Sequence, residues 1–346
     1  MTPRLPIAAE AKNVSIDLPA LLGMILATQQ PDGAIPWWPG HKTDPWDHVE
    51  SAMGLTVGGA QAQARLAYEW LAARQLPDGS WYAAYVDSQP TDCTRETNHA
   101  AYIAVGLYHY FLATGDLAFV QRLWPVVERA LAFVLHHQAP SGEIYWAISP
   151  QGRVDRMALL TGCSSIFLSL RCALALARVL DRPQPKWHSA LTDLHNCLMH
   201  KPHRFNTTKA RFSMDWFYPI LCGAITGPAA QSRIDQYWKK FIIQDMGARC
   251  VSDRPWVTIA ESCELVIALA AMGNQQQAAI LFRWICDHTF DDGTFWCGVT
   301  VPDMVVWPEE KHTWTNAVAL MAADALFHLT PAGGLFSHDH WQRVDI

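Results

Sequence analysis

The chain has 346 residues, of which 50% are hydrophobic and 17% are charged, so it can bury a large core. Its formal net charge of −6 argues against nucleic acid or an anionic membrane as the main partner, because both attract basic proteins. We expect no membrane span, and residues 1–11 contain a Pro-interrupted apolar stretch that is too short for a signal peptide. These features predict a cytoplasmic protein.

Apolar residues recur at helical spacing along the chain and predict about twelve helices in six pairs. The links inside the pairs are long and rich in aromatic residues, whereas the links between pairs are short steps such as Gly115-Asp116. Long connections are usually functional. The expected pairs are 17–30 with 47–59, 61–75 with 96–114, 117–138 with 158–180, 186–200 with 213–225, 230–243 with 257–273, and 275–289 with 312–329.

The two helices of each pair differ in composition. The first carries charges on one face, for example Arg65 and Glu69, whereas the second is apolar on every side, as in segment 166–177. A helix that is apolar all round is buried. We therefore expect an all-α fold, an (α/α)6 toroid of six helical hairpins whose second helices form the inner ring. Residues 1–346 are expected to form one such domain.

A short turn recurs after several of the first helices and is followed by aromatic residues. The turn occurs four times, as Gln30-Pro-Asp-Gly33, Gln75-Leu-Pro-Asp-Gly79, Gln138-Ala-Pro-Ser-Gly142 and Phe290-Asp-Asp-Gly293. A Gly that follows Asp or Ser tolerates a positive φ just after a helix ends. We interpret the repeat mainly as a structural device.

In a toroid, the N-terminal ends of the second helices converge on one mouth, and polar residues gather at these ends here. Charged side chains are rarely buried without a reason, so their recurrence in otherwise apolar helices indicates a site. The candidate catalytic residues are Asp47, Glu50, Asp215 and Glu261. The candidate substrate-binding residues are Trp46, His48, Glu96, Asn98, Tyr218, Arg254, Trp256, Glu264, His312 and Trp314.

Structural roles stay open for several of these residues. Asp44 stands directly before Pro45, and Asp47 and Asp215 fall in expected first turns, where Asp caps a helix. Glu96 has Arg95 beside it as an ion-pair partner, and the pattern favours core or rim positions for His48, His99 and His312. Glu261 is expected about one turn inside its helix with Glu264 on the same face, which favours a direct role.

Two carboxyl groups across a cleft, one protonated and one ionised, can hydrolyse a glycosidic bond; inverting enzymes hold them roughly 6.5–9.5 Å apart. The chain has 16 Trp, more than either its 13 Phe or its 9 Tyr, and the large apolar faces of Trp suit stacking on sugar rings. Trp46, Trp256 and Trp314 are the first choices for such platforms.

Arg95 and Arg254 would hold an anionic substituent. The sequence implies no cofactor and no metal.

Segment 255–296, with Glu261, Glu264 and the Asp291-Asp-Gly293 turn, resembles the late part of six-hairpin glycosidases, notably the glucoamylase-like group. Asp44-Pro-Trp-Asp47-His-Val-Glu50 is similar to the Trp-Asp-x-x-Glu region of that group. The resemblance implies a glycoside hydrolase that acts on an oligosaccharide or smaller substrate. It also implies a general acid and a general base, on Glu50 or Asp47 and on Glu261.

Other functions remain possible on the same fold. Gln75-Leu-Pro-Asp-Gly-Ser-Trp81 resembles the Gln-Trp repeat of squalene and terpene cyclases and related prenyltransferases, which implies an isoprenoid-handling enzyme as the alternative. The chain lacks the Asp-x-Asp-Asp motif of the cyclases, and Asp292, Cys297 and His312 do not have the spacing of the prenyltransferase zinc ligands. A sugar epimerase or lyase with His99, Tyr218 or His312 as base, and a non-catalytic sugar-binding toroid, are further alternatives.

Overall fold

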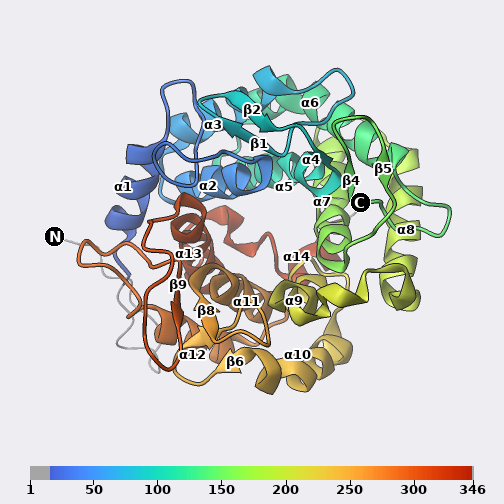
Figure 1. The fold of residues 1–346 in the computed structure, drawn as a ribbon. Coiled ribbons are helices and arrows are strands. Elements are labelled where there is room, and N and C mark those ends of the chain that lie inside the picture. The colour runs from blue at the N-terminus through green and yellow to red at the C-terminus, as the bar shows by residue number, and fades with distance from the viewer. Residues whose placement is uncertain (1–15, 345–346) are drawn as a thin grey trace.

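The computed structural model describes residues 16–344, and its helices form two concentric rings (Figure 1). Residues 1–11, on which the signal-peptide expectation rests, lie outside the described part. The inner ring consists of α2 (Pro45–Val57), α5 (Ile103–Thr114), α7 (Leu160–Val179), α9 (Ser213–Leu221), α11 (Ile259–Ala271) and α13 (Thr313–Phe327). The outer ring consists of α1 (Leu18–Thr28), α3 (Gln61–Arg74), α6 (Leu117–His136), α8 (Pro185–His200), α10 (Gly227–Phe241) and α12 (Gln275–Ile285).

The inner helices contact one another in chain order, from α2 through α5, α7, α9 and α11 to α13, and α13 contacts α2 again. Small residues allow this close approach: a Cβ added to Gly54 of α2 would lie 2.7 Å from the Cα of Ala317 in α13. Because the inner helices are covered on all sides, they read as apolar on every face. The predicted all-α toroid of paired helices is confirmed.

Helix α7 is long and apolar enough to cross a membrane by length and composition, contrary to the expectation that no segment would be. In the structure, 83% of its most apolar window is buried. It packs against α5 and α9 in the inner ring and against α8 outside it. Its apolarity therefore follows from its position in the ring.

Several helix boundaries differ from the prediction by a few residues, and two of these differences affect the site. The helix expected at 96–114 is divided at Tyr102 into α4 (Thr97–Ala101) and α5. The helix expected at 257–273 begins only at Ile259, because residues 256–258 form a strand. Glu261 consequently lies in the first turn of α11, and not one turn inside it.

Short antiparallel strands in the long links form a rim around the mouth. Their sequences are too short to show strand-like alternation, which explains why the pattern did not predict them. Two pairings join the links of different hairpins: β3 with β4, and β8 with β9. The strands are β1 (Ala84–Val86), β2 (Gln89–Asp92), β3 (Arg95–Glu96), β4 (Ala147–Ile148), β5 (Val154–Asp155), β6 (Ile242–Ile243), β7 (Gly247–Ala248), β8 (Trp256–Thr258) and β9 (Gly298–Thr300).

The repeated turns tie successive outer helices together. The side-chain amide of Gln75 donates to the carbonyl of Gly79 at 2.9 Å and to the carbonyl of Val126 in α6 at 2.8 Å. Gln29 makes the same two kinds of bond toward its own turn and α3, and Gln138 makes them toward its own turn and α8. The structural interpretation of the repeat is confirmed.

The C-terminal segment covers the end of the ring opposite the mouth. The 3-10 helix η3 (Pro331–Gly334) contacts α5 and α13, and α14 (His338–Arg343) follows it. The Nε2 atom of His338 lies 2.8 Å from the carbonyl oxygen of Ile220, near the C-terminal end of α9. The guanidinium of Arg171 lies 4.3 Å from the ring centroid of Trp341. The C-terminal segment thus packs against the inner helices at the end away from the mouth.

Candidate active site

A cavity of about 390 Å³ lies where the inner helices begin. Its walls are made by α2, α4, α7, α9, α11 and α13 together with the links that precede them. We call it the catalytic cavity. Its lining residues are Trp37, Lys42, Asp44, Trp46, Asp47, Glu50, Glu96, Asn98, His99, Trp146, Leu159, Thr161, Gly162, Met214, Glu261, Glu264 and Trp314.

The N-terminus of α2 forms the acidic wall of the cavity. Asp44 is the N-cap: its Oδ1 accepts from the backbone N–H of Asp47 at 3.0 Å, and Pro45 occupies the first helical position. The Oδ2 of Asp44 accepts from Trp37 Nε1 at 2.7 Å and lies 3.8 Å from Lys42 Nζ. These contacts fix Asp44 directly beside Asp47.

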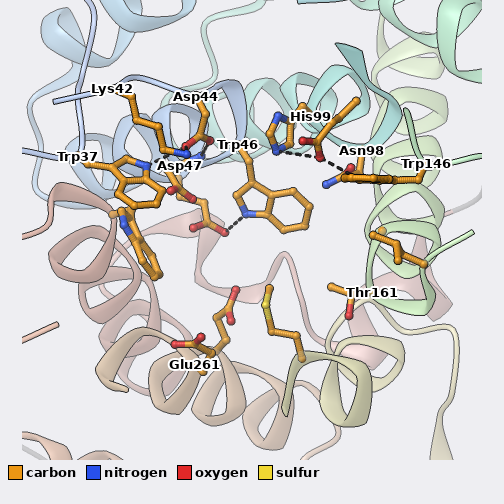
Figure 2. A pocket seen from close by; sticks show the side chains of 17 residues that line it. Trp37, Lys42, Asp44, Trp46, Asp47, Asn98, His99, Trp146, Thr161 and Glu261 are labelled. Atoms are coloured by element: carbon orange, nitrogen blue, oxygen red, sulfur yellow. Dashed lines mark hydrogen bonds and ion pairs between the residues drawn. The ribbon is translucent and has the colours of Figure 1, made fainter. Parts of the chain in front are cut away.

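Asp47 faces the opposite wall. Figure 2 shows its side chain and that of Glu261 on opposite sides of the pocket, with Trp46 between Asp47 and the His99 side. Burial raises the pKa of Asp47 well above its ordinary value, and the carboxylates of Asp44 and Glu50 raise it further. The site therefore favours the protonated form of Asp47, which has a proton to donate.

Glu50 lies one helical turn deeper than Trp46. Its Oε1 accepts from Trp46 Nε1 at 2.8 Å and from the Tyr102 hydroxyl at 3.3 Å. Burial raises the pKa of Glu50 to about 8 despite these two hydrogen bonds, and the charges of Asp44 and Glu261 act in the same direction as burial. Glu50 is thus neutral at pH 7, and it holds the Trp46 ring, which also stacks on Tyr102 at 4.6 Å.

Helix α11 forms the facing wall and presents Glu261 and Glu264. Glu264 accepts a hydrogen bond from the Tyr218 hydroxyl. Burial, followed by the nearby Glu50 carboxyl, raises the pKa of Glu264 well above its usual range. Glu261 lies one turn nearer the mouth, and its Oε2 has no hydrogen-bond partner among residues 16–344. Because buried polar atoms normally have partners, this oxygen is free for a substrate hydroxyl or a water.

The wall between α2 and α7 carries polar groups that suit sugar hydroxyls. Glu96 Oε2 accepts from Trp146 Nε1 at 3.1 Å and lies 3.5 Å from His99 Nε2. Asn98 Oδ1 is buried without a partner in the described part of the chain. Thr161 of α7 lies on the same side of the pocket as Asn98 and Trp146 in Figure 2. A few convergent polar groups in an otherwise apolar cavity are typical of ligand sites.

Two predicted residues lie behind the lining and not in it. Asp215 accepts from the Thr161 hydroxyl at 2.7 Å and from the Thr161 backbone N–H at 3.3 Å, so it positions Thr161. Tyr218 is buried and donates its hydroxyl proton to Glu264. Both act on the cavity through another side chain.

Two of the predicted histidines, His48 and His312, are buried and lie outside the lining of the catalytic cavity. His48 is fully buried; its Nδ1 accepts from the backbone N–H of Ile35 at 3.1 Å and its Nε2 donates to the carbonyl of Ala67 at 2.8 Å. Burial lowers the pKa of His48 to about 4, so it is neutral. His312 packs against Trp38 and does not line the cavity. Neither histidine lines the catalytic cavity, so the structure gives their predicted binding role no contact there.

The predicted residues of the rim also lie outside the catalytic cavity. Trp256 Nε1 donates to the carbonyl of Trp307 at 2.9 Å in the β8–β9 region. Arg254 is exposed in the turn before β8, and Arg95 is paired with Asp78. Strand formation at β3 and β8 directs these links along the rim, and this explains the difference.

Sequence reasoning missed Lys42, and it treated Asp44 only as a helix cap. It noted Trp37 and Trp146 as tryptophans of the links that suit a sugar-stacking cleft, but did not include them among the candidate residues. A signal for the tryptophans was present. Trp37 and Trp146 each follow the glycine of a repeated turn by four residues, and both enter the cavity. The residues two positions after these glycines, such as Trp81, are buried in the core.

Comparison with known proteins identifies one relative of high sequence identity. No known family model matches the sequence. The MMP endo-(1,4)-3-O-methyl-alpha-D-mannosidase of Mycolicibacterium hassiacum (strain DSM 44199 / CIP 105218 / JCM 12690 / 3849) is 47% identical over 312 residues, which are 90% of this chain and 86% of that protein.

Solved structures share the fold at low sequence identity. A glycosidase in complex with glucose has a TM-score of 0.69 and 14% identity, over 90% of this chain and 96% of the other. A D-mannose isomerase has a TM-score of 0.67 and 13% identity, over 94% and 99%. A sugar epimerase from a ruminal bacterium has a TM-score of 0.65 and 10% identity, over 88% of this chain and 95% of the other.

The toroid and the close relative together define a glycoside hydrolase of the (α/α)6 type. The chain belongs to the same family as the M. hassiacum mannosidase. The predicted hydrolase function is confirmed. The resemblance to terpene cyclases and prenyltransferases remains a resemblance of turns.

Proposed function

We propose that this chain is an endo-acting mannosidase that hydrolyses (1,4)-linked polymers of 3-O-methyl-α-D-mannose, the substrate class given by the name of its relative. The observation that carries the proposal is the facing pair of carboxyl groups, Asp47 on α2 and Glu261 on α11, across one cavity. A glycosidic bond between two sugars needs a carboxyl group on each side.

Asp47 is the proposed general acid. Its raised pKa favours the protonated form, and that proton goes to the glycosidic oxygen as the bond to the anomeric carbon breaks. Glu261 is the proposed general base, because its Oε2 is free to accept a proton from a water. The hydroxyl of that water bonds to the anomeric carbon. One proton has then left Asp47 and one has reached Glu261, so the protons balance.

The other lining residues are proposed to bind and orient the sugar. Trp46 and Trp314 offer ring faces, and Glu96 and Asn98 offer acceptors for hydroxyl groups. Glu264 lies deeper and closes the floor together with Glu50. Burial raises the pKa of both groups, which reduces the negative charge that they place near Asp47 and Glu261.

The experiment is the replacement of each carboxyl group by its amide. Glu261→Gln and Asp47→Asn should each lower kcat on a 3-O-methylmannose polymer by about 10²–10⁴-fold, because each removes one proton-transfer group. The melting temperature should change little, because the amides are nearly isosteric. New reducing ends measure the rate. Asp193→Asn, an exposed residue of α8, is the matched control. Full activity of either variant would place the chemistry elsewhere.

We also propose a cytoplasmic location. All nine cysteines lie in the described part of the chain, and all are free thiols. Thiols persist in reducing compartments, whereas exported proteins tend to form disulfides. The supporting measurement is the distribution of the protein between cytoplasmic and exported cell fractions.

A further inference from the structure

A second cavity, of about 550 Å³, lies beside the catalytic cavity between α1 and the link that precedes α13. We call it the distal cavity. One side is apolar and includes Met24, Ala27 and Trp38, and the other side carries charged groups of the link, Glu310 and Lys311 among them. An apolar wall facing polar groups is the surface that a partly methylated sugar requires.

An aromatic cluster separates the two cavities. It consists of Trp37, Trp38, His41, His312 and Trp314. Trp37 and Trp314 line the catalytic cavity, and Trp38 lines the distal cavity. The ring centroids of Trp37 and Trp38 are 6.1 Å apart, and those of Trp38 and His312 are 4.9 Å apart. The two cavities are therefore lined by neighbouring rings of one aromatic cluster.

The aromatic cluster is held rigidly. The rings of Trp38 and His41 stack at 3.6 Å with an interplanar angle of 20°. The backbone N–H of Thr313 donates to the carbonyl of Trp37 at 2.8 Å and joins the link before α2 to the start of α13. Figure 2 places Trp37 at the edge of the catalytic cavity beside Asp47. A rigid aromatic wall loses little conformational entropy when a ligand binds.

We propose that the distal cavity binds further sugar units of the polysaccharide that is cleaved in the catalytic cavity, so that the chain crosses the aromatic cluster from one cavity to the other. This inference rests on the proposed function. Methyl ethers and C–H faces of the sugars contact Met24, Ala27 and Trp38. Free hydroxyl groups contact the charged groups of the link, where Lys311 is also paired with Asp292.

The distal cavity also gives a physical reason for endo cleavage. An enzyme that cuts inside a chain must hold sugars on both sides of the broken bond. Contacts with remote sugars supply binding energy that the reacting sugar alone does not offer. A cavity that holds such sugars raises kcat/KM for long substrates more than for short ones.

The test compares a long and a short substrate, a dodecasaccharide and a tetrasaccharide of (1,4)-linked 3-O-methyl-α-D-mannose. Ala27→Trp fills the distal cavity from an exposed position of α1. The ratio of kcat/KM for the long substrate to that for the short one should fall about tenfold relative to wild type. Trp38→Ala, which removes the platform, should lower the same ratio. Ala118→Trp, at an exposed position of α6, is the control and should keep the wild-type ratio.

The outcomes separate the two proposals. If wild type cleaves both substrates but Ala27→Trp and Trp38→Ala keep its ratio, the distal cavity does not bind substrate and the inference is wrong. If wild type cleaves neither substrate, the proposed function is wrong and the inference falls with it. A lower ratio in both variants, with an unchanged ratio in Ala118→Trp, supports the inference.

Discussion

Asp44 shows how one residue acquires two roles. Its position before Pro45 is typical of an N-cap, and the structure confirms that it caps α2. The same carboxylate lies beside Asp47 and raises the pKa of Asp47. Capping is a local property that the sequence reveals, whereas the effect on Asp47 depends on how deeply the wall of the cavity is buried.

Asp44→Asn separates these two roles. Asn caps helices as well as Asp does, so the bond from Asp44 Oδ1 to the N–H of Asp47 is kept, whereas the oxygen that accepts from Trp37 Nε1 is lost. Removal of the neighbouring negative charge should lower the pKa of Asp47. If Asp47 must be protonated to act, activity is lost as pH rises through its pKa, so the alkaline limb of the kcat/KM profile should move to lower pH.

The matched control for Asp44→Asn is Asp116→Asn, because Asp116 caps α6 through the same bond to the third residue along, Phe119, at 3.0 Å. Its pH profile should equal that of wild type. An unmoved alkaline limb in Asp44→Asn would show that Asp44 does not set the protonation of the acid.

At the scale of elements, the repeated turn joins the outer helices and also feeds the mouth. In the first turn, the glutamine that donates to the glycine carbonyl and to the next outer helix is Gln29. The sequence pattern instead begins at Gln30. In each turn, the glycine also approaches the next outer helix. A Cβ on Gly79 would lie 2.0 Å from the carbonyl oxygen of Arg129, and one on Gly142 would lie 2.3 Å from that of Asp193.

Gly79→Ala should therefore destabilise the protein. Gly79 has φ +92°, a strained conformation for alanine that costs about 1–3 kcal/mol, and the clash with Arg129 adds to this cost. Gly40→Ala is the control, because Gly40 has φ +80° but no atom within 4 Å of the added Cβ. Denaturant unfolding measures both. Equal losses would mean that the contact between the turn and α6 contributes nothing.

For the whole molecule, closure of the ring brings together carboxyl groups that are far apart in the chain. Glu50 of α2 and Glu264 of α11 are both buried at the floor of the cavity, and the Glu50 carboxyl is one cause of the raised pKa of Glu264. Tyr102, which directly precedes α5, donates a hydrogen bond to Glu50, and Tyr218 of α9 donates one to Glu264. The unfolded chain has none of these contacts.

The stability of the protein should consequently depend on pH. The folded pKa of Glu50 is about 8 and its ordinary value is 4.5, so the folded state alone holds this proton between these pH values. The stabilising contribution is complete below pH 4.5 and is lost as pH rises toward about 8. Titration of this group changes the free energy of unfolding by at most about 1.4 kcal/mol per pH unit.

Glu50→Gln tests this dependence, because an amide keeps an acceptor for Trp46 and Tyr102 but does not titrate. Its free energy of unfolding should fall less steeply than that of wild type between pH 5 and 8 in a urea series at fixed ionic strength. Glu69→Gln, on the outer face of α3, should keep the wild-type slope. Parallel slopes for all three proteins would contradict the raised pKa of Glu50.

The sequence by itself determined the six helix pairs, the order of the two rings and the turns between them, because helical periodicity, an all-apolar inner helix and Gly-containing turns are local properties. It also placed the site at the starts of the inner helices. Only the tertiary structure decided which side chains enter the cavity. His48 and Glu50 are two residues apart on α2, yet His48 points outward to Ala67 of α3 and Glu50 points inward to Tyr102. In a helix that is buried on every side, hydrophobic periodicity does not indicate which face is turned to the axis of the ring, so closure of the ring makes that choice.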